Sequence, residues 1–343
     1  MDLPPQLEKP RKLFDNPQWQ RCYEDYLKYL WDRSNSAGTV RNASHTLHCF
    51  FKNPEKTPAN YTRSDVEQFM AARIRTDPKP RTRNLRLAIL KSFYAYASDY
   101  TVKFREKTKR LMDGSSPARH INRAVVEDTR RALEPEEVLR FLDVIRPAKQ
   151  TRWAKEQALR DYALFLVLLT TGRRESEIIN LRWGDISPSA RLSDGSLGVG
   201  YKWKGKGHVG KDSAAEMPQV AWDAICSYLI AAERFSRIKP QDAIFISKKT
   251  QWQRIPISPE QVGHRFRKYA CAAGMRLEIP DVVVHSLRIT FAIECYEACG
   301  RDIKATMEAL GHKDPGTTML YLLKRRRPKR STAGDAIGAK YAR

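Results

Sequence analysis

A change in apolar patterning between residues 101 and 129 constrains the fold of this chain most. Before it, apolar side chains recur at helical spacing, as in the stripe from Trp19 to Leu30. Within it the periodicity fades around Gly114-Ser115-Ser116-Pro117, and it resumes near Ala132. A length of 343 residues suits two domains. We therefore predict a helical domain over residues 12–112, a linker over 113–131 and a second domain over 132–343.

Helix-start signals support the helical prediction for the first domain. Pro17 follows Asp15 and Asn16, either of which can cap a helix that begins with proline. Thr62 and Asp65 have the spacing of a capping box. A further helix is expected over 40–51, and an apolar stripe from Leu87 to Ala97 predicts another.

The second domain mixes helical and strand patterns. A strongly apolar helix is expected over 162–169, and Ser258-Pro259-Glu260-Gln261 predicts another helix start. Between them, Leu197, Val199, Tyr201 and Trp203 alternate with glycine and lysine, which is typical of a strand. The expected fold class is mainly α with a small antiparallel β-sheet in this domain.

The charge of the chain indicates a polyanionic partner. Lys and Arg number 62 against 39 Asp and Glu, a net charge of +23. Such a surplus attracts nucleic acid, although a merely soluble basic protein is the alternative. One expected helix carries a row of basic residues that could lie along a phosphate backbone, or could simply be a solvated face. This row consists of Arg81, Arg83, Arg86 and Lys91.

Three short segments carry the most specific signal. They are Thr171-Gly172-Arg173-Arg174-Glu175-Ser176-Glu177, His285-Ser286-Leu287-Arg288 and Leu310-Gly311-His312, with Tyr321 nine residues beyond His312. Arginine matches phosphate oxygens bidentately, and histidine can donate hydrogen bonds or move protons near neutral pH. Tyrosine can serve as a covalent nucleophile. Together these residue types suggest chemistry on a phosphodiester.

These segments resemble the motifs of the tyrosine recombinase family, which includes phage integrases and Xer-like proteins. The first is similar to the family's T-G-x-R-x-S-E-I box, the second to H-x-L-R, and the third to L-G-H followed by two threonines and the tyrosine. The resemblance extends over residues 132–321, and the helical first part resembles the family's core-binding domain.

The resemblance implies a role for each matched residue. The spacing to Ser176-Glu177 selects Arg174, rather than Arg173, as the catalytic arginine of the first box. Arg174 and Arg288 would bind the scissile phosphate, His285 and His312 would donate hydrogen bonds or transfer protons, Glu177 would orient the arginine, and Tyr321 would be the nucleophile.

The family also uses a lysine on a β-hairpin as the general acid for the departing 5′ oxygen. Its usual G-K-G setting matches Gly205-Lys206-Gly207, which favours Lys206, with Lys204 as the second choice. The segment up to Met217 departs from the family's usual short hairpin, so the register of this lysine stays open.

The implied mechanism is two transesterifications on double-stranded DNA through a 3′-phosphotyrosyl intermediate, by a homo-tetramer assembled on DNA. No cofactor and no metal are expected, since the sequence lacks a phosphate-binding GxxxxGK[ST] loop and a carboxylate cluster spaced for two metals. The chain is expected to be cytoplasmic and DNA-associated, with no membrane partner. The alternatives are a type IB-like topoisomerase and a non-catalytic DNA-binding regulator on the same scaffold.

Overall fold

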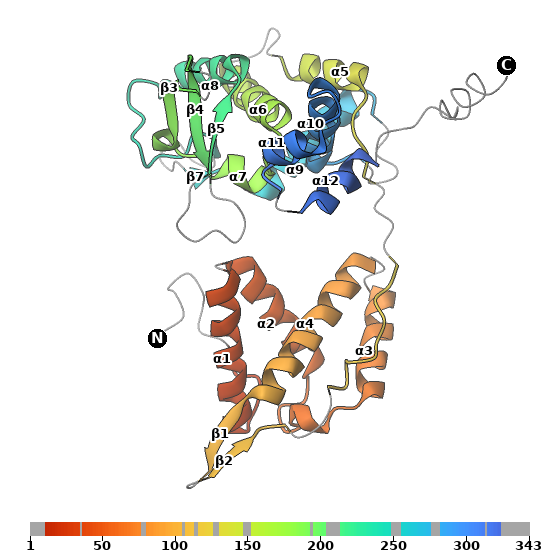
Figure 1. Cartoon of the computed structure of the whole chain (residues 1–343). Helices are drawn as coiled ribbons and strands as arrows, with labels where there is room; N and C mark the ends of the chain where they lie inside the picture. Colours follow the sequence, from red (N-terminus) through yellow and green to blue (C-terminus); the bar gives the residue numbers. More distant parts are fainter. Residues whose placement is uncertain are drawn as a thin grey trace, which may run out of the picture. The chain divides into compact units, whose positions relative to one another are not determined.

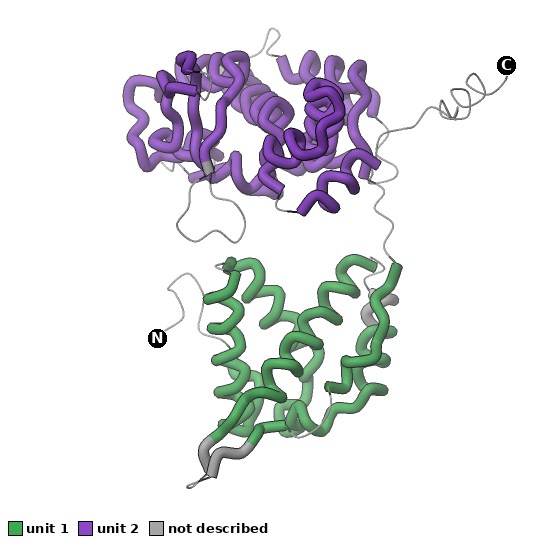
Figure 2. The backbone as a smooth tube through the Cα atoms, in the orientation of Figure 1, with its two compact units in different colours: residues 1–128 green, residues 129–343 purple. Residues whose placement is uncertain are grey.

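The structure is a computed structural model, and its contacts divide the chain into two compact units, Met1–Asp128 and Thr129–Arg343 (Figure 2). None of the described helices is long and apolar enough to cross a membrane. The structure describes residues 11–34, 36–76, 80–104, 107–112, 116–125, 130–146, 152–192, 195–203, 213–247, 255–275, 282–312 and 314–323.

The described residues of unit 1 form a bundle of four α-helices with a short β-hairpin (Figure 1). The helix starts follow the sequence signals, because Asn16 Oδ1 accepts hydrogen bonds from the first turn of α1 and Thr62 pairs with Asp65 as a capping box. The elements are α1 (Pro17–Ser34), α2 (Ala37–Phe50), η1 (Pro58–Asn60), α3 (Arg63–Thr76), α4 (Pro80–Asp99), β1 (Thr101–Phe104) and β2 (Lys107–Arg110).

Aromatic side chains fill the core of unit 1. The ring of Phe93 on α4 packs edge-on against Tyr26 on α1 and against Phe51, with centroids 5.3 and 5.5 Å apart. Such pairs contribute about 0.5–1.5 kcal/mol each beyond their buried area. The same core includes Ala118 and Ile121, which belong to the stretch predicted as linker. Residues 116–125 are therefore a packed segment of this unit.

Unit 2 is mainly helical, with a small sheet at one edge of the unit, which confirms the predicted fold class (Figure 1). Its antiparallel sheet has the strand order β3–β4–β5. The elements are α5 (Pro135–Ile145), α6 (Arg152–Thr171), α7 (Glu175–Ile179), η2 (Trp183–Asp185), β3 (Ile186–Arg191), β4 (Leu197–Trp203), β5 (Ser213–Met217), α8 (Gln219–Ala231), β6 (Ile246–Ser247), β7 (Ile255–Pro256), α9 (Pro259–Ala272), α10 (Val284–Ala298), α11 (Ile303–Leu310) and α12 (Pro315–Leu322).

Helix α6 is the centre of unit 2. Every residue from Ala163 to Leu168 is buried, so this part of the helix is apolar on all sides rather than along one stripe. It packs against α5, α8 and α10. On β4, Val199 and Tyr201 point into the same core, as the predicted alternation requires.

Gly172 makes the turn that ends α6 and leads into α7. Its φ of +61° lies in the left-handed region, and a Cβ there would stand 2.1 Å from the ring of Phe291. Both facts require glycine at this position. The turn places Arg174 at the N-cap of α7.

We expect Gly172→Ala to lower the free energy of unfolding of the chain by about 2–4 kcal/mol, because it combines left-handed strain with a clash in the core. Gly263→Ala is the matched control. Gly263 lies inside α9, and a Cβ there would meet open space. This control should stabilise the chain by about 0.5–1 kcal/mol. Urea denaturation measures the free energy of unfolding of both variants. Equal changes in the two variants would contradict the requirement for glycine at position 172.

Candidate active site

The candidate active site lies where the turn before α7 meets α10, α11 and α12 in unit 2 (Figure 1). Helix α10 packs against both α11 and α12, and these two helices pack against each other. His285 and Arg288 lie one helical turn apart near the start of α10, so both project from the same face. The structure therefore brings the three motif segments together.

Arg288 links the segments of the site through its hydrogen bonds. Its side chain is only 2% exposed. Nη1 donates to the carbonyl of Gly172, and Nη2 donates to the carbonyl of Leu310 (3.0 Å) and to Nε2 of His312 (2.7 Å). Its Nε is buried with no hydrogen-bond partner among the described residues. One guanidinium thus joins the turn after α6 to the end of α11, and keeps one donor unused.

His312 supports Arg288 from the turn after α11. Gly311 ends that helix in the left-handed conformation, and His312 N bonds to the carbonyl of Met307. Because a guanidinium can only donate, Nε2 of His312 must be the acceptor, and the proton of the neutral ring lies on Nδ1. Nδ1 is 2.9 Å from Oγ1 of Thr318, to which it donates. Both ring nitrogens of His312 are therefore engaged.

The electrostatics agree with a neutral His312. Burial, followed by the charges of Arg288, Arg174 and Arg173, lowers the pKa of His312 to about 4. The pKa of Arg288 is also lowered, by burial first and by the charge of Arg174 second, while the hydroxyl of Tyr321 acts in the opposite direction. These mutual effects indicate that several positive charges are held close together.

Tyr321 lies on α12 between the two histidines. Its hydroxyl is 2.8 Å from Nε2 of His285. Its ring packs edge-on against the rings of His285 and His312, with centroids 5.4 and 5.3 Å away. These contacts fix the ring while leaving the hydroxyl at a group that can accept a proton.

Arg174 is the accessible cation of the site. Its side chain is 37% exposed, whereas that of Glu177 is 3% exposed. Glu177 accepts from Nη1 of Arg174 and from its backbone N–H, both at 2.9 Å. A buried carboxylate thus fixes the guanidinium from behind and leaves its remaining donors available.

Arg173 has a different environment from its neighbour. It is 4% exposed, its guanidinium stacks 3.8 Å from the ring centroid of Trp203, and Nη2 donates to the carbonyl of Ala309. It joins the end of β4 to the end of α11. Sequence reasoning used Arg173 only to choose Arg174, and neither Trp203 nor Thr318 was recognised as a contact of the site.

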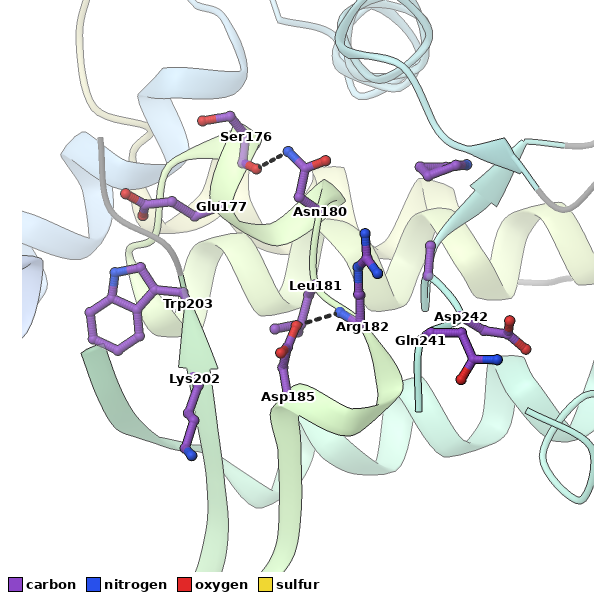
Figure 3. A pocket seen from close by; sticks show the side chains of 12 residues that line it. Ser176, Glu177, Asn180, Leu181, Arg182, Asp185, Lys202, Trp203, Gln241 and Asp242 are labelled. Carbon is purple, nitrogen blue, oxygen red and sulfur yellow. Dashed lines mark hydrogen bonds between the residues drawn. The ribbon is translucent and has the colours of Figure 1, made fainter. Parts of the chain in front are cut away.

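The remaining sequence candidates lie elsewhere. Lys204 and Lys206 lie outside the described residues, which stop at Trp203 (Figure 3) and resume at Ser213. On α4 of unit 1, Arg81 is exposed, Arg83 and Arg86 are half-buried, and Nζ of Lys91 donates to the carbonyl of Ile121 (2.9 Å). Part of the predicted basic row thus holds the segment 116–125 in place.

The lowered pKa of His312 predicts a pH dependence of stability. The unfolded chain binds a proton at this residue below about pH 6.5, whereas the folded chain does so only near pH 4. The contribution of His312 to the free energy of unfolding is therefore fully present above pH 6.5 and is lost as the pH falls toward 4. We expect His312→Gln to reduce this loss by roughly 3 kcal/mol, at 1.36 kcal/mol per pKa unit.

The exposed His264 on α9 provides the control for this measurement. His264→Gln should retain the pH dependence of the wild type. Urea denaturation at several pH values between 4 and 7 gives the free energy of unfolding of each variant for comparison with the wild type. A His312→Gln curve parallel to the wild-type curve would contradict the neutral state assigned to this residue.

Family models match both units of the chain. The model of the phage integrase family matches residues 131–327, more than half of the chain. The model of the phage integrase N-terminal SAM-like domain matches residues 23–100. All the site residues described above lie within the first match.

Curated relatives align along most of the chain. One is a tyrosine recombinase XerA of Thermococcus onnurineus, 27% identical over 87% of this chain and 89% of the relative. Another is a tyrosine recombinase XerD of Listeria monocytogenes, 26% identical over 87% of this chain and 92% of the relative.

Solved structures share the fold at low sequence identity. One is the XerH site-specific recombinase bound to palindromic difH substrate in a post-cleavage complex, with a TM-score of 0.65 at 16% identity, covering 97% of this chain and 99% of that one. A λ integrase dimer bound to a COC′ core site gives a TM-score of 0.63 at 16% identity, covering 91% and 79%. These structures show the fold, and the family match over more than half of the chain shows that the chain belongs to the phage integrase family of tyrosine recombinases.

Proposed function

We propose that the chain is a site-specific DNA recombinase that cleaves and rejoins strands through a 3′-phosphotyrosyl bond at Tyr321. The observation that carries this proposal is the placement of the Tyr321 hydroxyl, 2.8 Å from a histidine nitrogen and beside the buried Arg288. A nucleophile, a proton acceptor and an anion-binding group are thus adjacent.

The scissile phosphate is assigned to Arg174 and Arg288. The two guanidinium groups repel each other, and Glu177 forms its ion pair with Arg174 alone. An anion placed between them would relieve this repulsion and could also use the free Nε of Arg288. The same contacts would strengthen as negative charge develops on the phosphate in the transition state.

In the first step, the oxygen of Tyr321 attacks the phosphorus, and the bond from phosphorus to the 5′ oxygen breaks. The tyrosine proton passes to Nε2 of His285, which requires that ring to be neutral with its proton on Nδ1. The departing 5′ oxygen takes a proton and leaves as a hydroxyl. The family resemblance assigns this proton to Lys206, with Lys204 second.

In the second step, a 5′ hydroxyl from the partner strand attacks the phosphotyrosine. The phosphorus–tyrosine bond breaks, the attacking hydroxyl gives its proton to the lysine that donated one in the first step, and the proton held by His285 returns to Tyr321. One phosphodiester bond is exchanged for another at each step, so the bond energy is retained without ATP. His312 takes no proton in this scheme, because its two nitrogens hold Arg288 and Thr318 in place.

We further propose that four copies assemble on two DNA sites. Strand exchange requires a 5′ hydroxyl from a second duplex, and each duplex is cut on both strands. A λ integrase tetramer bound to a Holliday junction is among the solved structures with this fold, at a TM-score of 0.63. The net charge of +23 suits a protein that brings two polyanions together.

The role of Tyr321 can be tested by covalent trapping. The probe is a pool of nicked duplexes with randomised centres, in which the nick lets the cleaved fragment diffuse away. We expect wild-type protein to form a DNA adduct that survives denaturing detergent, and Tyr321→Phe to form none. Tyr296→Phe, on the same unit, is the control and should be trapped like the wild type. A DNA adduct formed by Tyr321→Phe would show that Tyr321 is not the nucleophile.

The role of His285 predicts a kinetic defect. Glutamine at this position can still hydrogen-bond the tyrosine hydroxyl but cannot take its proton, so His285→Gln should slow adduct formation by about 10²–10⁴-fold. Its affinity for DNA should stay close to that of the wild type in a filter-binding assay. Wild-type rates of adduct formation with His285→Gln would contradict proton transfer to this residue.

A further inference from the structure

Two cysteine side chains meet at the C-terminal end of α10, the helix near whose start His285 and Arg288 lie. Sγ of Cys295 is 3.9 Å from Sγ of Cys299, which is a contact between the two sulfurs without a bond. Both are free thiols, of which Cys299 is exposed and Cys295 is half-buried. No step of the proposed strand-transfer chemistry uses this pair.

The backbone holds the two thiols at a fixed spacing. The N–H of Cys299, which caps the C-terminus of α10, donates to the carbonyl of Cys295 at 2.9 Å. Beyond it, Gly300 and Arg301 both have positive φ, and the N–H of Arg301 donates to the carbonyl of Tyr296 at 2.7 Å. Left-handed residues and a returning hydrogen bond end the helix at a defined position, so the two sulfurs are preorganised as a pair.

A disulfide fits this spacing poorly. Its two Cβ atoms have to stand about 3.5–4.5 Å apart. The Cβ atoms of helical residues four positions apart are separated by about 5–6 Å. Closing a bond between the sulfurs would therefore distort the last turn of α10, whereas a third atom bonded to both sulfurs spans the wider gap without moving the backbone.

The chemistry of the pair limits what this third atom can be. Thiols and thiolates are soft ligands, which select soft centres over Mg²⁺ or Ca²⁺. A structural zinc ion takes four protein ligands and a catalytic one three. Within the described part of the chain, no group of three histidine, cysteine or carboxylate side chains forms such a site. A centre that bonds two thiols and brings its own remaining substituent meets both conditions, as a monosubstituted trivalent arsenical does.

The protonation state of the thiols agrees with such a ligand. Burial first, and the charge of Cys299 second, raise the pKa of Cys295 to about 11, while a hydrogen bond with Thr306 of α11 acts in the opposite direction. At neutral pH Cys295 is therefore a thiol rather than a thiolate, and thiols react slowly with peroxides and alkylating agents. An arsenical oxide needs no thiolate in advance, because its oxygen removes both thiol protons as water.

We propose that Cys295 and Cys299 form a dithiol site for trivalent arsenicals, independent of the recombinase chemistry at the other end of α10. In the binding step, both S–H bonds and the bonds between arsenic and its oxygen break, two As–S bonds form, and one water molecule leaves. No electron is transferred, so the arsenic stays trivalent and neither an oxidant nor a reductant is needed. The product is a ring that ties the last turn of α10 together.

The test titrates the reduced full chain with phenylarsine oxide, after the reductant has been removed, and counts the remaining free thiols with a chromogenic disulfide. We expect each bound probe to mask a pair of thiols in the wild type. Cys295→Ser and Cys299→Ser should each weaken binding by about 10²–10⁴-fold, since the second As–S bond forms within one molecule. Cys299 is exposed, so Cys299→Ser leaves the core unchanged. Wild-type affinity in either variant would overturn the proposal.

Cys271→Ser is the matched control. Cys271 is exposed, as Cys299 is, but it is the only cysteine of its helix, α9. This variant should bind phenylarsine oxide with the affinity of the wild type. A fall in affinity equal to that of Cys299→Ser would assign the binding to thiols in general and would overturn the paired site.

A second arm incubates the same proteins with oxidised glutathione. An internal disulfide would form as the two thiols lose two protons and two electrons, which reduce the glutathione disulfide to two glutathione thiols. We expect intact mass spectrometry to find no chain lighter by two hydrogen atoms. Such a product in the wild type, absent from Cys295→Ser and Cys299→Ser, would identify a redox-sensitive pair and overturn the assignment to a bridging ligand.

Discussion

The active site depends on the burial of a single guanidinium, that of Arg288. Removing a charged group from water costs several kcal/mol unless its donors find acceptors. Two backbone carbonyls and His312 Nε2 meet this requirement, and they come from the turn after α6 and from the end of α11. The hydrogen bonds that make this burial tolerable therefore also fix the relative positions of the motif segments.

The burial of Arg288 also distinguishes His312 from His285, which the sequence alone could not separate. His312 receives a hydrogen bond from Arg288, so it has to be neutral and its ring is fully engaged. His285 lies on the same helix face as Arg288, and its Nε2 is at the hydroxyl of Tyr321. A positioning role thus suits His312 and a proton-transfer role suits His285. Glu177 accepts a hydrogen bond from the guanidinium of Arg174, as the two backbone carbonyls do from that of Arg288.

Local rules predicted much of the fold, and non-local contacts account for what they missed. Caps at Asn16, Thr62 and Ser258 marked real helix starts, because capping needs only residues within one turn. The β1–β2 hairpin was missed because each strand has only four residues and β2 contains no apolar residue. In the site, the motifs identified the residue types, whereas the link from His312 to Thr318 depends on packing that no spacing rule encodes.

Arg173 shows how the sheet is tied to this arrangement. Its guanidinium lies against Trp203, the last described residue before Lys204, and also donates to the carbonyl of Ala309, near the end of the helix that precedes His312. A cation over an indole ring contributes about 2 kcal/mol when it is desolvated. The strand that leads to Lys204 and Lys206 is thereby anchored to the turn that supports Arg288.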